Sequence, residues 1–349
     1  MIKVLSKYKM LAIHKGKALL YHKGKLYTQD IYSENKPKLL LALPISAKRK
    51  LPVRFRLTER LLRLEPRIAM WIDGDNFLLS CAGRIYLVNV QERKLTEELQ
   101  LRPRMYNPLM FAREANGNVL FGEYFSNNDQ EEVCIYEREN GKWNKVYSFP
   151  AGAIYHIHGL VVDENRIYIL TGDEDKESAI WYTEDHFRSV ELLIGGSQKC
   201  RACVAFPYQE GLIYATDTPL EQNNLYILKR INGKWVNEAL CEMPGPCIYG
   251  TVRRNGYYFA TSVEPDASLS SRRYRFSYKL GKGVKDRYTH IIQCTKDGKI
   301  KDVAQFKKDI WPMLLFQFGN CLFPDADLDE KLLVCPQSVK KYDGKTVEI

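Results

Sequence analysis

The chain is built from short runs in which apolar and polar residues alternate, and the runs are separated by Asp, Glu, Asn, Gly and Lys. Four such runs follow one another between residues 158 and 195: HGLVVDE, RIYILTGD, SAIWYTED and SVELLIG. Each run has the length of a strand, and the separators are turn-forming residues. Four strands in about 40 residues is the size of one β-propeller blade.

The same order of runs recurs on both sides of this unit, at residues 105–150 and 200–243. The turn sequence NGKW occurs twice, at Asn140–Trp143 and Asn232–Trp235. The two copies are separated by two units of about 46 residues, which is a period typical of propeller blades. An internal repeat of this length favours a propeller more strongly than any single predicted strand.

These units predict an all-β fold, a single β-propeller domain over residues 1–349 with about seven four-stranded blades; six blades is the alternative. We expect blades at roughly 1–42, 67–101, 105–150, 158–195, 200–243, 245–306 and 312–349. Two segments interrupt the repeat. One is a basic stretch between the first two blades, at 43–66, and the other is a long loop insertion at 265–288.

The composition agrees with this fold, since 12% of the residues are aromatic and aromatic residues favour strands. No run of eighteen apolar residues occurs, so no membrane span is expected. The N-terminal sequence MIKVLSKYKM lacks the apolar stretch of a signal peptide, and we expect a cytoplasmic protein. The nine cysteines are scattered, and the single CxxC pair, Cys200 and Cys203, is expected to hold buried free thiols.

The net charge of +10 is concentrated at the beginning of the chain, where residues 1–66 hold 16 Lys and Arg against 4 Asp and Glu. This basic stretch is either a solvated edge or a surface for an anionic partner such as an acidic glycan or a membrane surface. No nucleic-acid-binding motif accompanies the charge, so specific nucleic-acid binding is not expected.

Antiparallel strand order predicts where polar residues gather. The start of the innermost strand of a blade and the end of its second strand lie on the same face. Loops on that face converge around the propeller axis, so we expect one shared polar mouth. The alternative is that the carboxylates merely cap turns. The predicted catalytic candidates are Glu123, His156, His158, Asp173, Asp217 and Glu264, and the predicted substrate-binding residues are Asn107, Tyr124, Arg201, Asn223, Tyr249 and Gln317.

His156 and His158 are two residues apart on a predicted strand and therefore share a face. Such a pair suits acid–base work, or it is one packed and one exposed histidine. No cofactor is expected; if a metal binds, its ligands are His156, His158 and Asp173. Arg201 is suited to bind the carboxylate of an acidic sugar, or else pairs with Asp173 or Asp217.

The blade sequence TGDEDKESAIWYTEDHF, the turns ERENGKW and KRINGKW, and the motifs GEYF, HIHG, GSQKCRA and TDTPLEQN resemble the sialidase-like, BNR-repeat (Asp-box) propeller family. The resemblance is closest to polysaccharide-associated members and covers about residues 105–270. The Asp-box is matched in part by Thr183, Asp185, Gly141, Trp143, Gly233 and Trp235.

This resemblance implies a propeller with carbohydrate chemistry, either glycoside hydrolysis or polysaccharide lysis. Sialidases use three arginines, and only Arg201 is expected at this mouth, so cleavage of sialic acid is not expected. We therefore predict a glycan-processing enzyme of the hydrolase or lyase class acting on an acidic or polar saccharide. The alternative is a non-catalytic propeller that binds carbohydrate or protein.

Overall fold

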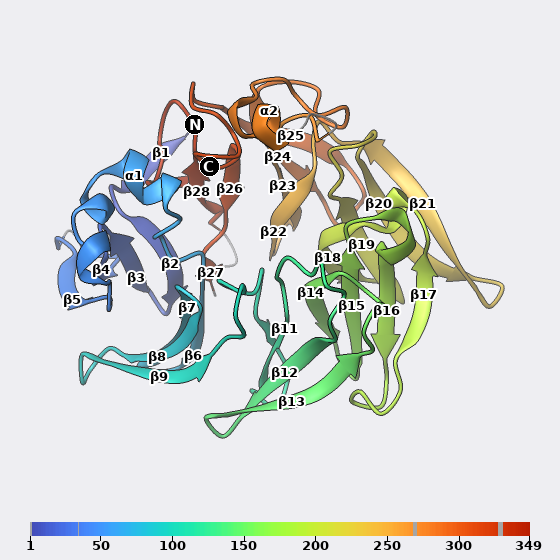
Figure 1. The fold of residues 1–349 in the computed structure, drawn as a ribbon, viewed down its shortest axis with the longest axis horizontal. Coiled ribbons are helices and arrows are strands. Elements are labelled where there is room, and N and C mark those ends of the chain that lie inside the picture. Colours follow the sequence, from blue (N-terminus) through green and yellow to red (C-terminus); the bar gives the residue numbers. More distant parts are fainter. Residues whose placement is uncertain (1, 34, 268–270, 327–330) are drawn as a thin grey trace.

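The computed structural model is a β-propeller of seven sheets arranged around one axis (Figure 1). It describes residues 2–33, 35–267, 271–326 and 331–349. The all-β class and the count of seven blades are thereby confirmed. Neighbouring strands within a blade are antiparallel, and the chain passes from the innermost strand to the outermost one in six of the blades.

The blades have the following strands. The first holds β2 (Lys9–His14), β3 (Lys17–His22), β4 (Lys25–Asp30) and β5 (Lys38–Ala42), and the second β6 (Ile68–Asp73), β7 (Asn76–Cys81), β8 (Arg84–Asn89) and β9 (Lys94–Gln100). The third holds β10 (Ala112–Arg113), β11 (Val119–Gly122), β12 (Val133–Glu139) and β13 (Lys142–Phe149), and the fourth β14 (His156–Asp163), β15 (Arg166–Gly172), β16 (Ala179–Thr183) and β17 (Glu191–Gly195). The fifth holds β18 (Ala202–Tyr208), β19 (Gly211–Thr216), β20 (Asn224–Ile231) and β21 (Lys234–Glu242), and the sixth β22 (Cys247–Arg253), β23 (Gly256–Thr261), β24 (Tyr288–Cys294) and β25 (Ile300–Lys307).

The two ends of the chain close the ring in the seventh blade. This sheet has β26 (Asn320–Leu322) innermost, then β28 (Leu333–Gln337), β29 (Thr346–Glu348) and finally β1 (Lys3–Ser6). A short strand, β27 (Asp325–Ala326), pairs in parallel with β2 of the first blade. The sequence interpretation placed residues 1–42 in the first blade, whereas β1 completes the last one. Closure joins the termini because an unpaired outer strand would leave its backbone groups unsatisfied.

Burial falls from the axis to the rim of each blade. In the fourth blade the first six residues of β14 are all buried, whereas most of β17 is exposed or half-buried. Inner strands are covered by neighbouring blades on both faces, which explains their continuous apolar runs. The outer strands are mostly exposed or half-buried because they lie at the rim, where fewer neighbours cover them.

The repeated NGKW turns connect the third and fourth strands of blades three and five. In each turn Asn and Gly both have positive φ: 49° and 79° at Asn140 and Gly141, and 50° and 81° at Asn232 and Gly233. Two consecutive residues with positive φ form the type I′ turn that matches the twist of a hairpin, and Asn-Gly is its favoured sequence.

The basic segment between the first two blades forms two short 3₁₀ helices, η1 (Ala47–Arg49) and η2 (Pro52–Arg54), and the helix α1 (Arg56–Leu61). It is anchored by ion pairs to the last blade. The Arg56 guanidinium binds both carboxylate oxygens of Asp343 at 2.9 and 3.0 Å. Arg60, whose side chain is 3% exposed, lies 2.6 Å from Asp309 and also donates to the Phe316 carbonyl. Part of the positive charge of residues 1–66 is therefore paired inside the protein.

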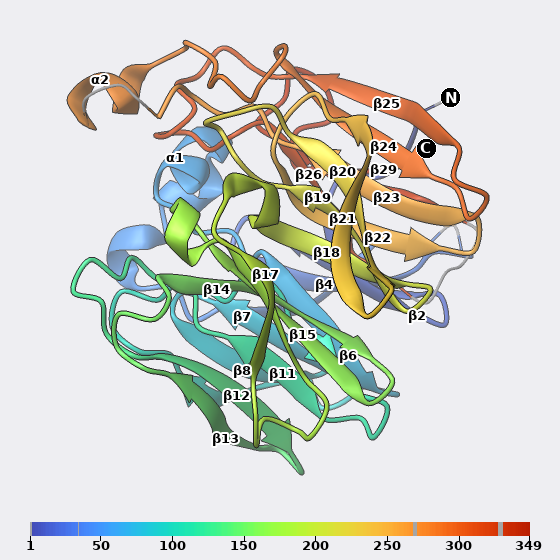
Figure 2. The ribbon, with the colours of Figure 1, turned by 90° about the vertical axis from the view of Figure 1, so that its right-hand side faces the viewer.

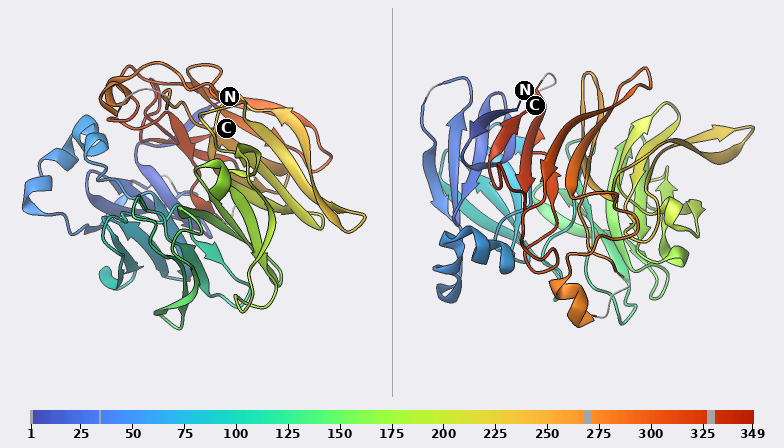
Figure 3. Two further views of the ribbon diagram at one scale, coloured as in Figure 1. Left: turned by 45° about the vertical axis from the view of Figure 1, so that its right-hand side comes forward. Right: turned by 90° about the horizontal axis from the view of Figure 1, so that it is seen from above.

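Both helices lie on one face of the propeller (Figure 2; Figure 3, right). The second, α2 (Ser271–Phe276), belongs to the connection between β23 and β24, where the loop insertion was expected. Residues 268–270 of that insertion are outside the described residues. The same face carries the 3₁₀ helices η3 (Asp175–Glu177) and η4 (Gln198–Cys200). Within the described ranges, no helix is both long and apolar enough to span a membrane.

The Arg60 ion pair gives the first prediction. Replacing Arg60 with Ala removes a buried guanidinium that binds Asp309 and the Phe316 carbonyl, while Asp309 keeps Lys308 as a partner. The variant should therefore lose about 2 kcal/mol of unfolding free energy. Urea denaturation measures the change. Arg54→Ala, an exposed arginine in the same segment, should change the free energy by less than about 0.5 kcal/mol. Equal losses in the two variants would show that the pair does not anchor the segment.

Candidate functional site

The candidate site lies on the face that carries the helices, where blades three to six meet near the axis. Tyr124 follows β11, His156 and His158 begin β14, and Asp173 directly follows β15. The next two blades add a second group, consisting of Arg201, Cys203, Asp217, Ser262 and Glu264. Antiparallel pairing places these strand ends at one edge, as the sequence interpretation expected.

A β-bulge re-aims the second histidine. In the pairing of β14 with β15, Ile157 faces Thr171 and Gly159 faces Leu170, so His158 is the extra residue. The same irregularity occurs in blade five at Cys203. A bulge bends the strand and turns the unpaired side chain, and it is a common feature beside functional sites. The bulge thus brings two equivalent positions of adjacent blades, His158 and Cys203, into the same region.

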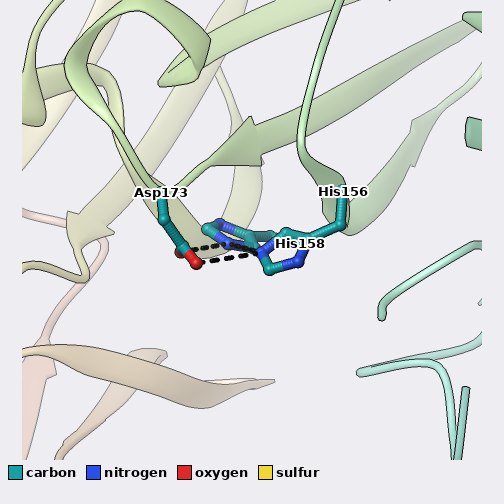
Figure 4. A group of neighbouring side chains, drawn as sticks. All are labelled: His156, His158 and Asp173. Atoms are coloured by element: carbon teal, nitrogen blue, oxygen red, sulfur yellow. Dashed lines mark hydrogen bonds and ion pairs between the residues drawn. The ribbon is translucent and has the colours of Figure 1, made fainter. Parts of the chain in front are cut away.

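The two imidazoles and the Asp173 carboxylate face one another (Figure 4). The Nε2 atoms of His156 and His158 are 2.9 Å apart. The Asp173 oxygens lie 3.2 Å from the His158 Nε2 and 3.5 Å from the His156 Nε2. The histidine side chains are 4% and 1% exposed, while Asp173 is 34% exposed, so the carboxylate is the accessible member.

Contacts of the Nδ1 atoms determine which nitrogen of each imidazole carries the hydrogen. The His156 Nδ1 is 3.1 Å from the Phe125 carbonyl oxygen, and the His158 Nδ1 is 3.0 Å from that of Ala202. A carbonyl can only accept, so each Nδ1 must carry the hydrogen. In neutral rings both Nε2 atoms then present lone pairs to each other and to a carboxylate. This arrangement requires either one additional proton or a cation between the three groups.

Such a donor set fits a divalent metal ion. Histidine ligands in metal sites commonly donate their second ring nitrogen to a backbone carbonyl, as both rings do here. All three ligand atoms lie within 4.8 Å of one another. Two imidazoles and one carboxylate leave further coordination positions for water or substrate. Burial lowers the pKa of His156, which disfavours the additional proton.

Arg201 supplies the positive charge beside this group. Its guanidinium lies 2.9 Å from the Asp173 carboxylate and also donates to the Asp173 backbone carbonyl at 3.0 Å. Burial alone would raise the pKa of Asp173, but a proton shared with the two histidines and the nearby Arg201 charge hold it well below its usual value. The Arg201 Nε is buried and has no acceptor among the described residues. Part of the guanidinium's hydrogen-bonding capacity is therefore unused.

Two further carboxyl groups, those of Asp217 and Glu264, lie near Arg201, and the Asp217 carboxylate is 3.9 Å from its guanidinium. The Cys203 thiol donates to Asp217 at 3.0 Å, and Ser262 donates to Glu264 at 2.5 Å. Burial, followed by the negative charge of Asp217, raises the pKa of Glu264 to about 8. Burial also raises the pKa of the Cys203 thiol well above its usual value, so this cysteine is a neutral donor. One carboxyl of the pair is thus held protonated near neutral pH.

Tyr124 completes the cluster, with its ring centroid 4.3 Å from that of His156. Burial and then the Asp173 charge raise the pKa of its phenol well above 10. Arg63, from the segment after α1, is close enough to Tyr124 and Tyr249 to interact with them electrostatically. Sequence reasoning missed Arg63, Ser262 and Cys203 as site residues, since only the folded chain brings them to this face.

Five of the predicted residues do not join the cluster. The Glu123 carboxylate binds Arg102 at 2.9 Å and the Cys134 backbone N–H at 2.9 Å. The Asn107 side chain contacts Ser80 in the second blade.

The other three predicted residues also have partners elsewhere. Asn223 forms hydrogen bonds with Thr216, Thr218 and Gly283. Gln317 donates to the Arg60 carbonyl, and Tyr249 lines a cavity along the axis.

That cavity, of about 490 Å³, is lined mainly by the inner strands. Its walls combine apolar residues with a few charged ones such as Arg67 and Asp325. A second His and carboxylate group, Glu114, Glu137 and His186, lies between blades three and four. His186 is half exposed there, and the Asn118 amide donates to Glu137. These features lie apart from the His156 cluster.

No protein-family model matches the chain, and no curated protein matches it. Many solved structures share the fold. Virginiamycin B lyase from Staphylococcus aureus aligns with a TM-score of 0.60 at 10% identity, covering 100% of this chain and 97% of its own. An oligogalacturonate lyase in complex with manganese aligns with a TM-score of 0.58 at 12% identity over 99% and 90% of the two chains. YCF48 bound to a D1 peptide aligns with a TM-score of 0.56 at 10% identity over 100% and 95%.

At these identities the similarities establish the propeller fold alone. The fold that the sequence resemblance implied is supported, whereas none of the comparisons shows the sialidase-like family itself. A fold of this kind supports many functions, so function depends on the residues of the site.

The Glu264 carboxyl gives a pH prediction. Its pKa is raised in the folded protein, so the folded state binds this proton more tightly than the unfolded state. Stability from this group is therefore lost as the pH rises. Between about pH 5 and pH 8, the unfolding free energy of the wild type should fall relative to that of Glu264→Gln by roughly 1.4 kcal/mol per pH unit. Urea titrations at several pH values test this, and parallel pH curves would contradict it.

Gly172 gives a packing prediction. A Cβ at this position would lie 2.7 Å from the Cε1 of His158 and 3.2 Å from the Cγ of Arg201. Gly172→Ala should therefore destabilise the protein by about 1–3 kcal/mol through overpacking. Gly74→Ala is the matched control, because no atom lies within 4 Å of the added Cβ. Thermal unfolding of the two variants compares them, and equal melting temperatures would show that the imidazole is not tightly packed.

Proposed function

We propose that this protein is a lyase that eliminates across the glycosidic bond of a carboxylate-bearing saccharide at the axial mouth. The observation that carries the proposal is the set of three acceptors, two imidazole Nε2 atoms and the Asp173 carboxylate, directly beside the Arg201 guanidinium. A site of this kind can hold a divalent cation and an anionic group side by side. The fold shared with an oligogalacturonate lyase and with virginiamycin B lyase is consistent with this reading.

Recognition of the substrate carboxylate falls to Arg201. A guanidinium binds a carboxylate through parallel hydrogen bonds, and the Arg201 side chain is 13% exposed. His156, His158 and Asp173 would hold the cation. When bound, that cation supplies positive charge that stabilises the carboxylate as electron density shifts toward it. The acidic saccharide expected from the sequence is the substrate class that these charges suit.

Two residues near Arg201, Asp217 and Tyr124, transfer the protons of the reaction. Asp217 from blade five removes the proton from the carbon next to the carboxylate. The electrons of that C–H bond form the new carbon–carbon double bond, and the bond to the glycosidic oxygen breaks. Tyr124 from blade three gives its proton to the departing oxygen, since burial keeps the phenol protonated. The products are a saccharide with a free hydroxyl and an unsaturated uronate.

A hydrolase that uses two carboxylates is less favoured by the same contacts. Glu123 is committed to Arg102 and to a backbone N–H, which removes it from the predicted acid–base set. In the remaining pair, Glu264 is bound to Ser262, which leaves only Asp217 for proton transfer. Hydrolysis by this route needs two carboxyl groups that both act on the sugar.

The second candidate function is binding without turnover. The low exposure of both imidazoles, 4% and 1%, favours it. A cation enclosed by these rings would help to hold a ligand without reaching the bond that a reaction must break. A propeller of the same fold binds a peptide. This alternative makes a different prediction for the assay below.

The test is a lyase assay on uronic-acid oligosaccharides with Mn²⁺ or Mg²⁺, followed by the ultraviolet absorbance of the unsaturated product. We expect turnover that a chelator abolishes and that added metal restores. Arg201→Gln should lower kcat/KM about 100-fold, equivalent to about 2.7 kcal/mol of transition-state stabilisation. Asp163→Asn, at the far end of β14, is the matched control and should leave the rate unchanged.

Several results would contradict the proposal. Absence of unsaturated product from every acidic oligosaccharide, with either metal, would exclude a lyase of this class. Tight binding without turnover would favour the non-catalytic alternative. Equal activity of Arg201→Gln and the wild type would show that the guanidinium does not bind the substrate carboxylate.

A further inference from the structure

Large apolar side chains are exposed on the face that carries the candidate site. In the segment before α1, Leu51 is 64% exposed and Phe55 is 60% exposed, and Leu62 follows the helix at 45%. The loop after β25 adds Ile310 at 68% and Trp311 at 40%. Single exposed apolar residues are ordinary, but a group of them on one face indicates an interaction surface.

The two segments that carry these residues are bound to each other. Arg60 binds Asp309 and the Phe316 carbonyl, and Arg63 donates to the Leu314 carbonyl at 3.0 Å. The α1 segment is therefore fixed against the 309–316 loop. Further round the same face, α2 ends in the exposed Phe276 (Figure 2). We call the exposed side chains of residues 48–63 and 310–311 the α1 surface.

The charges of the α1 surface have a single sign. Every exposed charged residue between 46 and 63 is basic: Lys48, Arg49, Lys50, Arg54 and Arg63. The single acidic residue of this stretch, Glu59, is buried and accepts a hydrogen bond from Tyr21. Among the described residues, none of these five basic side chains forms an ion pair, whereas the half-buried Arg56 and the buried Arg60 do. Arg56, Arg60 and Arg63 hold the segment in place, and the exposed Lys48, Arg49, Lys50 and Arg54 are available to a partner.

We propose that the α1 surface docks on an anionic lipid bilayer. Basic residues beside exposed Leu, Phe, Ile and Trp are the combination that binds at the boundary between headgroups and acyl chains. Each Lys or Arg near an anionic membrane contributes about 1 kcal/mol to binding, and Trp is favoured at the interface. The proposal does not depend on the lyase reaction, and it places the axial mouth on the side of the protein that faces the membrane.

The side-chain types favour a bilayer over a soluble acidic polysaccharide. Sugar rings pack on flat aromatic rings, whereas most of the exposed apolar residues of this surface are branched aliphatic side chains. Leu51, Leu62 and Ile310 would gain little from a hydrated glycan. Their burial among acyl chains is favourable in proportion to the apolar area removed from water.

The test is co-sedimentation of the full chain with vesicles of phosphatidylcholine, alone or mixed with phosphatidylglycerol. We expect at least tenfold stronger partition to the anionic vesicles at low salt, with a loss at high salt because the charges are screened. Replacing Lys48, Arg49 and Lys50 together with Gln should weaken partition at least tenfold. Replacing Leu51 and Phe55 with Ser should weaken it at least fivefold.

The matched control lies on the opposite face, in the hairpin between β20 and β21. Arg230, Ile231, Lys234 and Val236 are two basic and two apolar exposed residues. Changing them to Gln and Ser should leave partition unchanged, and circular dichroism checks that each variant is folded. Equal partition to neutral and anionic vesicles would overturn the proposal. So would a Leu51/Phe55 variant that binds vesicles normally, or a wild type that binds polygalacturonate but not vesicles.

Discussion

Antiparallel pairing of the two inner strands of each blade determines where the polar residues of this protein meet. His156 and His158 begin an inner strand, and Asp173 ends the strand beside it, so hydrogen bonding between β14 and β15 brings all three to one edge. The ring arrangement then adds the equivalent edge of the next blade, with Arg201 and Asp217. The site is therefore a consequence of blade geometry, and it depends on the ring remaining closed by β1 and β29.

The electrostatics of this edge follow from backbone contacts. Two backbone carbonyls, of Phe125 and Ala202, require a hydrogen on the outer nitrogen of each imidazole. The inner nitrogens are consequently acceptors at 2.9 Å, and Asp173 adds a third acceptor. Two buried imidazole acceptors that face each other and a carboxylate are stable together only around a positive species. These backbone contacts therefore determine which ring nitrogens would hold the proposed cation.

Much of the fold could be predicted from the sequence, because blade repeats leave a period in the chain. The NGKW turns marked two hairpins correctly, since Asn-Gly specifies a type I′ turn by its positive φ angles. Closure of the last blade by β1 was not predicted, as its local pattern fits a strand of either blade. The convergence of His156, His158, Asp173 and Arg201 followed from strand order. The separation of Glu123 did not, because its partner Arg102 lies in a loop with no repeated pattern.

Other parts of the site depend on geometry that residue types do not encode. The bulges at His158 and Cys203 turn these side chains toward the site, and a bulge leaves no clear mark in an alternating pattern. Likewise, the basic stretch after the first blade divides into buried anchors, such as Arg60, and exposed residues, such as Arg49. The composition of this segment gives its total positive charge. Only the packing of α1 against the last blade shows which basic side chains remain exposed for a partner.

The protonation of the two imidazoles tests the central claim most directly. Nitrogen-15 NMR of the ring nitrogens, recorded in metal-free protein and after addition of Zn²⁺, reports which nitrogen carries hydrogen or metal. We predict protonated Nδ1 in both rings, and a shift of both Nε2 resonances when the ion is added. A stable imidazolium at neutral pH whose resonances do not respond to the metal would contradict the account.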